Sequence, residues 1–92
     1  MPKLSNAEID TLLTEHPAWM LVNGSLTREA TFGDFAGAMV FVNRVAALAE
    51  QAGHHPDIDI RYNKVRLTLT SHDVGGLTAR DARMVTRLSQ EF

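Results

Sequence analysis

The sequence contains no cysteine among its 92 residues. This absence excludes a disulfide framework, a thiolate metal site and a thiol nucleophile. No apolar run approaches the roughly 18 residues that a membrane-spanning helix needs, and residues 1–6 lack the apolar region of a signal peptide. We therefore expect a soluble, cytoplasmic protein with no membrane partner.

An excess of charge of one sign is also missing. Nine Lys and Arg residues stand against eleven Asp and Glu residues, which gives a formal net charge of -2. The basic residues are scattered along the chain and form no stripe that would bind a phosphate backbone, so we expect no nucleic-acid partner. The length predicts one domain over residues 1–92. Because the core of so short a chain is modest, we expect association with copies of itself to add to its stability.

Turn and cap signals divide the first third of the chain. Ser5 and Glu8 fit a capping box and predict a first helix, which ends before a His-Pro pair. Asn23-Gly24 predicts a β-hairpin over residues 19–32, because both central positions of a type I′ turn need φ > 0.

The rest of the chain repeats this alternation. A long helix with a wide apolar surface is predicted from Asp34 to Ala52, with Gly53 as the residue that ends it. A period-two alternation over residues 57–70 predicts a second hairpin with one apolar and one polar face, and Thr78 begins a last helix. This order predicts an α+β fold, α-ββ-α-ββ-α, in which three helices pack on one face of a four-stranded antiparallel sheet. The edge strands of that sheet would be open for pairing with another subunit.

Three of the four histidines, His54, His55 and His72, lie in one 19-residue window around the second hairpin. Histidine has an unperturbed pKa of about 6.5 and exchanges protons near neutral pH. If Asn63-Lys64 is the two-residue loop, three apolar pairs face each other: Tyr62 with Val65, Ile60 with Leu67 and Ile58 with Leu69. The same register predicts that His55 lies opposite His72 on the polar face, where paired Cβ atoms are about 4.5–5.5 Å apart.

These histidines have more than one interpretation. In the first, they form a site, and Asp81 at the start of the last helix orients one of them. In the second, they are loop residues that satisfy backbone groups near a helix end. For Asp81, helix capping alone is an equally good explanation. Zinc needs three or four convergent ligands, but the adjacent His54 and His55 diverge in an extended chain and no His-x-His spacing is present, so we expect no metal.

Taken together, the residues around the histidines resemble the signature of the pterin-4a-carbinolamine dehydratase family. The matching segments are His54-His55-Pro56-Asp57, Tyr62-Asn63-Lys64-Val65, Ser71-His72-Asp73, Gly75-Gly76-Leu77-Thr78 and Asp81. The resemblance covers essentially the whole chain. Ser71 replaces the threonine that is usual before the third histidine, and Ile58 stands where some members have a tryptophan near the substrate.

The resemblance implies dehydration of 4a-hydroxytetrahydropterin to quinonoid dihydropterin, which recycles the tetrahydrobiopterin cofactor of aromatic amino-acid hydroxylases. The reaction requires no metal and no organic cofactor. By carry-over, His72 is the general acid, His54 is the base or cation stabiliser, His55 binds the pterin and Asp81 supports the histidines. The register argument instead places His55 nearest His72, so the division between acid and base stays open.

The resemblance also implies possible partners. Family members form dimers or tetramers, and a hydroxylase is a candidate partner. Some members act as dimerisation cofactors of a homeodomain transcription factor, for which the first and last helices are candidate surfaces here. A catalytically silent pterin-binding relative is the third alternative.

Overall fold

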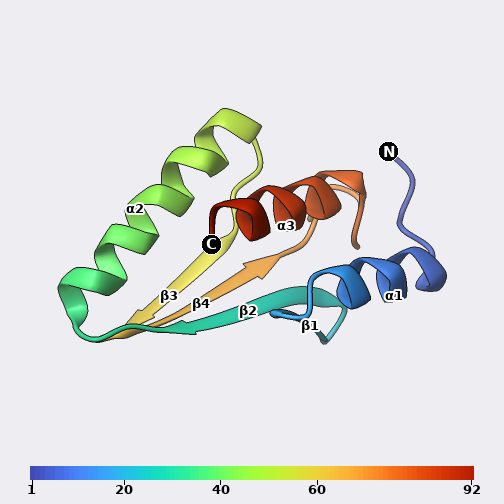
Figure 1. Ribbon diagram of the computed structural model, residues 1–92. Coiled ribbons are helices and arrows are strands. Elements are labelled where there is room, and N and C mark those ends of the chain that lie inside the picture. The colour runs from blue at the N-terminus through green and yellow to red at the C-terminus, as the bar shows by residue number, and fades with distance from the viewer.

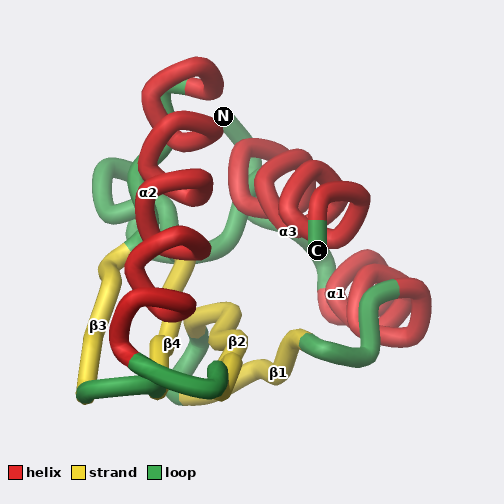
Figure 2. Tube along the Cα trace, turned by 60° about the vertical axis from the view of Figure 1, so that its left-hand side comes forward, coloured by secondary structure: helices red, strands yellow, loops and turns green.

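The predicted order of elements is found in the computed structural model, which describes residues 1–92. The elements are α1 (Asn6–Glu15), β1 (Trp19–Val22), β2 (Ser25–Thr31), α2 (Phe35–Ala52), β3 (Asp57–Arg61), β4 (Lys64–Leu69) and α3 (Ala79–Glu91). The strands form one antiparallel sheet in the order β1-β2-β4-β3, and the helices lie on one side of it (Figure 1; Figure 2). The predicted α+β fold is confirmed.

Local sequence signals set the ends of the helices. The backbone N–H of Glu8 donates to Ser5 Oγ (3.1 Å) and that of Ser5 donates to Glu8 Oε1 (2.8 Å), which is the predicted capping box of α1. Asp34 caps α2 by accepting from the N–H of Gly37 at 2.8 Å. The helix ends at Gly53, whose φ of 65° is in the left-handed region that favours glycine.

The first hairpin turns at the predicted residues. Asn23 and Gly24 have φ values of 50° and 79°, and Val22 pairs with Ser25 across the turn. On β2, Leu26 is completely buried under the helices.

The second hairpin differs from the predicted register. Arg61 pairs with Lys64, so the two-residue loop is Tyr62-Asn63 rather than Asn63-Lys64. Tyr62 adopts φ 52° and its side chain is exposed, whereas the sequence pattern placed it in the apolar row. Asn63 is fixed from outside the hairpin: its Nδ2 donates to the Phe32 carbonyl, and its own carbonyl accepts from the Phe32 N–H, both at 2.8 Å.

This difference removes the predicted histidine pair. The observed partners are Ile60 with Val65 and Ile58 with Leu67. A shift of two residues keeps the side chains within the paired strands on their predicted faces, because side chains alternate with a period of two. It does not keep His55 opposite His72, and both residues lie beyond the ends of the paired strands.

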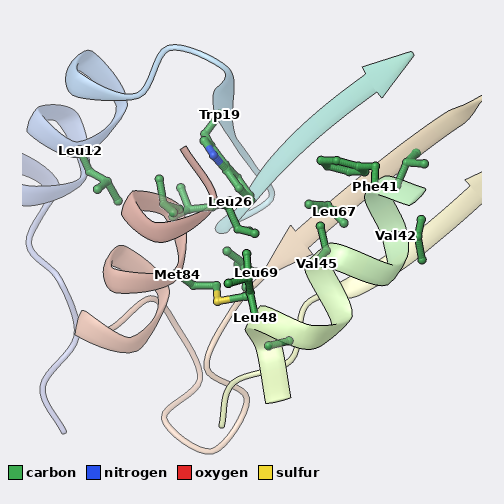
Figure 3. Packing of buried hydrophobic residues seen from close by; sticks show 14 of the residues in the cluster. Leu12, Trp19, Leu26, Phe41, Val42, Val45, Leu48, Leu67, Leu69 and Met84 are labelled. Carbon is green, nitrogen blue, oxygen red and sulfur yellow. The ribbon is translucent and has the colours of Figure 1, made fainter. Parts of the chain in front are cut away.

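The core lies between the sheet and the helices (Figure 3). Its sheet side includes Leu26, Val65, Leu67 and Leu69. Its helix side includes Phe41, Val45 and Leu48 of α2 and Met84, Val85 and Leu88 of α3. Complete burial of each leucine contributes about 1.5–3 kcal/mol to folding. This shared core holds the end of α2 and the first half of α3 in fixed positions, and the candidate site lies at these two places.

The edges of the sheet are β1 and β3. The side chains of Met20, Leu21 and Val22 on β1 are exposed, although all three are apolar. None of the three helices combines the length and the apolarity that crossing a lipid bilayer requires.

Candidate functional site

The centre of the candidate site is a contact between His54 and Asp81. Gly53 reverses the chain after α2, and the residue that follows, His54, turns its ring toward the start of α3. Its Nε2 lies 2.6 Å from Oδ1 of Asp81, the third residue of α3. The Asp81 side chain is completely buried and the His54 side chain is 12% exposed. Of the three candidate histidines, His54 is the one that contacts Asp81.

The second carboxylate oxygen of Asp81 accepts two hydrogen bonds. Oδ2 accepts from Ser71 Oγ at 2.8 Å and from the backbone N–H of Thr78 at 3.0 Å. Ser71 Oγ also lies 2.9 Å from Thr78 Oγ1. A buried carboxylate without such donors would be strongly destabilising, so this network permits a negative charge beneath the histidine. Asp81 thus caps α3 and contacts His54 at once.

The contact occupies Nε2 of His54, and Nδ1 makes no hydrogen bond. An ionised Asp81 carboxylate can only accept hydrogen bonds, and with Asp81 in that form Nε2 of His54 is the donor to Oδ1. In the neutral ring, Nδ1 then has an available lone pair. The arrangement prepares His54 to accept a proton.

His55 is held by a different carboxylate. Its Nε2 lies 2.6 Å from Oε2 of Glu50, in the last turn of α2. Both side chains are largely exposed, so solvent weakens the attraction between them. Sequence reasoning did not assign a role to Glu50. In the sequence, Glu50 is simply a carboxylate five residues before His55. The turn at Gly53 brings the two side chains together.

His72 lies in the turn that joins β4 to α3. Ser71 and Gly76 form an isolated bridge, and Gly75 donates its N–H to the carbonyls of Ser71 (3.0 Å) and His72 (3.2 Å). The side chain of His72 makes no hydrogen bond and the residue is exposed. The neighbours of His72 link this turn to the start of α3: Ser71 donates to Asp81, and Asp73 accepts from Arg80.

A pocket of about 560 Å³ opens beside His54, between the end of α2 and one face of α3. Its lining consists of Ala52, His54, Arg80, Ala82, Arg83, Met84, Thr86, Arg87 and Gln90. Neither His55 nor His72 belongs to the lining. The three arginines form a local basic cluster, although the sequence pattern indicated only scattered basic residues. No group of three or more histidine and acidic side chains is arranged to hold a metal ion.

Arg80 connects this pocket to the turn that carries His72. Its guanidinium donates to Oδ1 of Asp73 at 2.6 Å. This hydrogen bond lowers the pKa of the Asp73 carboxyl below its ordinary value. The Nε of Arg80 is buried and has no hydrogen-bond partner.

The chain is similar to proteins of one family over nearly its whole length. Residues 2–91 match the family described as Pterin 4 alpha carbinolamine dehydratase. A Chloroflexus aurantiacus protein with the provisional name pterin-4-alpha-carbinolamine dehydratase is 51% identical over 98% of this chain and 97% of its own length. An Acidobacterium capsulatum protein with the same provisional name is 56% identical over 88% of each chain.

The chain is also similar to solved structures of pterin dehydratase-like proteins. The crystal structure of a transcriptional coactivator/pterin dehydratase from Brucella melitensis has a TM-score of 0.89 and 31% identity, and the match covers 97% of each chain. A pterin dehydratase-like protein identified as a RuBisCO assembly factor in the alpha-carboxysome has a TM-score of 0.61 and 25% identity, with 78% of this chain and 83% of that chain covered.

Proposed function

Because the chain belongs to the pterin 4 alpha carbinolamine dehydratase family, we propose that it dehydrates a 4a-hydroxytetrahydropterin to quinonoid dihydropterin. The observation that carries this proposal is the buried contact between Asp81 and His54. It provides a base whose ring is oriented by a carboxylate, as an elimination requires. The names of the relatives support a dehydratase activity.

The reaction needs two proton transfers. The C4a–O bond breaks, a proton joins the departing hydroxyl to form water, and the adjacent N5 loses its proton as the C4a=N5 double bond forms. We assign removal of the N5 proton to His54, since Nδ1 has the free lone pair when Nε2 donates to Asp81. We assign delivery of the other proton to His72, whose side chain has no competing partner. Each transfer contributes typically about 10²–10⁴-fold to the rate.

The two remaining residues have supporting roles in this proposal. His55 binds the pterin, and the exposed Glu50 restricts the orientation of its ring. Asp81 is a positioning residue that acts through His54. The product is the form that a reductase converts back to tetrahydropterin, so the activity would serve the recycling of tetrahydrobiopterin for an aromatic amino-acid hydroxylase.

The test is stopped-flow measurement of the decay of a 4a-hydroxytetrahydropterin with and without the protein. The double variant His54→Ala/His72→Ala should lose the acceleration, while His16→Ala, a histidine outside the site, should keep it. Thermal unfolding of all three proteins checks that the fold is intact. Full turnover by the double variant would overturn the catalytic assignment.

We also infer that the chain forms homo-oligomers, a dimer or a tetramer. This inference is supported by exposed apolar side chains at the open edge strand β1 (Met20, Leu21, Val22) and on α2 (Phe35, Val40). Light scattering should give a mass at least twice that of the chain. The substitution Leu21→Lys, which places a charge on the edge strand, should lower the mass if β1 forms the interface. A monomer at all concentrations would contradict the inference.

Protein binding is the second candidate function. It is favoured by the 72% exposure of Val40 in the first half of α2, and by the description of the Brucella relative as a coactivator as well as a dehydratase. The sequence had indicated α1 and α3 as the candidate surfaces, but Phe35 and Val40 of α2 are the more exposed large apolar residues. Complex formation with a purified aromatic amino-acid hydroxylase, without acceleration of 4a-hydroxypterin decay, would favour this function over catalysis.

A further inference from the structure

Three arginines of α3 lie along one side of the helix. Arg80, Arg83 and Arg87 are spaced by three and four residues, which places them on one helical face, and all three line the pocket beside His54. No acidic residue belongs to that lining. The lining therefore carries three positive charges and no negative one in a chain whose formal net charge is -2, and only Arg80 has a carboxylate partner, Asp73, beside the pocket.

Stability does not explain this cluster. Like charges three and four residues apart on a helix repel one another, and Arg80 lies in the first turn, where the helix dipole disfavours a positive charge. Arginines elsewhere in the chain offset such costs by pairing with carboxylates, as Arg44 does with Glu91 and Arg66 does with Glu29.

The pocket arginines are largely without such partners. Arg83 makes no ion pair or hydrogen bond, and Arg87 donates only to the neutral side chain of Gln51. Arg80 binds Asp73 through one terminal nitrogen, but its Nε is buried without a partner. The guanidinium groups of Arg83 and Arg87 thus line, without a carboxylate partner, a cavity that has the volume of a small-molecule site, about 560 Å³.

We propose that this pocket binds an oxyanion, phosphate or carboxylate, that is carried on the side chain of the pterin substrate. This proposal rests on the proposed function, because His54 belongs both to the pocket and to the assigned catalytic residues. A guanidinium matches the geometry of an oxyanion with two parallel hydrogen bonds. The reacting ring would lie at the His54 end of the pocket, and its charged side chain would extend along α3 toward Arg83 and Arg87.

The experiment compares pterins that differ in side-chain charge. Binding of neopterin, neopterin phosphate, folate and inorganic phosphate to the intact protein is measured at low and high salt. A wild-type affinity about tenfold or more higher for neopterin phosphate than for neopterin is expected, since charge-assisted hydrogen bonds are added. Folate tests whether a carboxylate replaces the phosphate. High salt should reduce the preference.

Two matched double variants locate the effect. Arg83→Gln/Arg87→Gln should abolish the preference for the charged pterin, and Arg83→Lys/Arg87→Lys should restore part of it. Arg61→Gln/Arg66→Gln changes the net charge equally on the opposite face of the sheet and should keep the preference. Thermal unfolding confirms that each variant is folded.

The outcomes distinguish failure of the anion-binding proposal from failure of the proposed dehydratase function. Equal wild-type affinity for neopterin and neopterin phosphate, or a preference that survives in Arg83→Gln/Arg87→Gln, overturns the proposal. If inorganic phosphate alone binds as tightly as neopterin phosphate, the site is a free-anion site and the link to the pterin is wrong. Turnover of a 4a-hydroxytetrahydropterin with an uncharged methyl side chain is measured separately. Its absence would contradict the proposed function whatever the binding preference.

Discussion

His54 and Asp81 are separated by 27 residues in sequence, yet Nε2 of the first lies 2.6 Å from Oδ1 of the second. One belongs to the turn after α2 and the other to the first turn of α3, so the packing of these helices over the sheet determines the contact. The carboxylate is completely buried and engaged by Ser71 and Thr78 as well. Asp81 thus both caps α3 and holds the ring of His54.

The substitution Asp81→Asn tests this double role. An amide offers one acceptor oxygen where the carboxylate offers two, so at least one of the three donors loses its partner. The free energy of unfolding should fall by about 1–3 kcal/mol in urea denaturation. The decay of 4a-hydroxypterin should slow about 10²-fold or more, because His54 loses its orientation and its preferred tautomer.

A matched control is Asp34→Asn, which changes the same residue type at the start of α2. Asparagine is as good an N-cap as aspartate, and Asp34 contacts no histidine. Both stability and turnover should stay near wild-type values. An Asp81→Asn protein with full turnover would show that the carboxylate is only a cap.

The sequence predicted most of the fold because its signals were local. The capping box at Ser5 and Glu8 and the turn at Asn23-Gly24 depend on residues within a few positions of one another. The register of the second hairpin depends instead on Asn63, whose hydrogen bonds reach Phe32 at the end of another strand. No pattern within the hairpin reports that contact, and the predicted pairing was therefore wrong by two residues.

The same distinction applies to the candidate site. The family signature identified His54, His55, His72 and Asp81 as candidates, but periodicity could not decide which histidine meets Asp81. That choice depends on how the chain turns after Gly53, which also brings Glu50 to His55. The sequence pattern indicated only scattered basic residues, although Arg80, Arg83 and Arg87 are spaced by three and four residues. Only the pocket shows that these three residues share one lined surface.

Glu50→Gln tests whether the contact with His55 positions the pterin. Because both side chains are largely exposed, the free energy of unfolding should change by no more than about 1 kcal/mol. If His55 binds the substrate, KM should rise several-fold while kcat changes little. Glu15→Gln, an exposed glutamate on α1 that makes no ion pair, serves as the control. A loss of kcat with unchanged KM would contradict a binding role.

Lowering the pH should break the contact between Asp73 and Arg80. The hydrogen bond from Arg80 lowers the pKa of the Asp73 carboxyl in the folded state. The stabilisation is therefore present above the unfolded pKa of about 3.9 and is lost as the pH falls through the lower folded pKa. Carboxyl NMR titration should show a higher Asp73 pKa in Arg80→Gln than in wild type. In Arg44→Gln, which removes a distant partner of Glu91, the Asp73 pKa should not move.

Gly53→Ala tests whether the turn after α2 positions His54. The φ of 65° at Gly53 is unfavourable for alanine, although a Cβ there would meet no atom within 4 Å. The cost is therefore one of backbone strain and should lower the free energy of unfolding by about 1–2 kcal/mol. Gly33→Ala is the matched control, because its Cβ also meets nothing and its φ is not in the left-handed region. If the turn aims His54 at Asp81, Gly53→Ala should also slow 4a-hydroxypterin decay at a temperature where the variant is fully folded. Equal turnover of the two alanine variants would mean that the core alone positions the histidine.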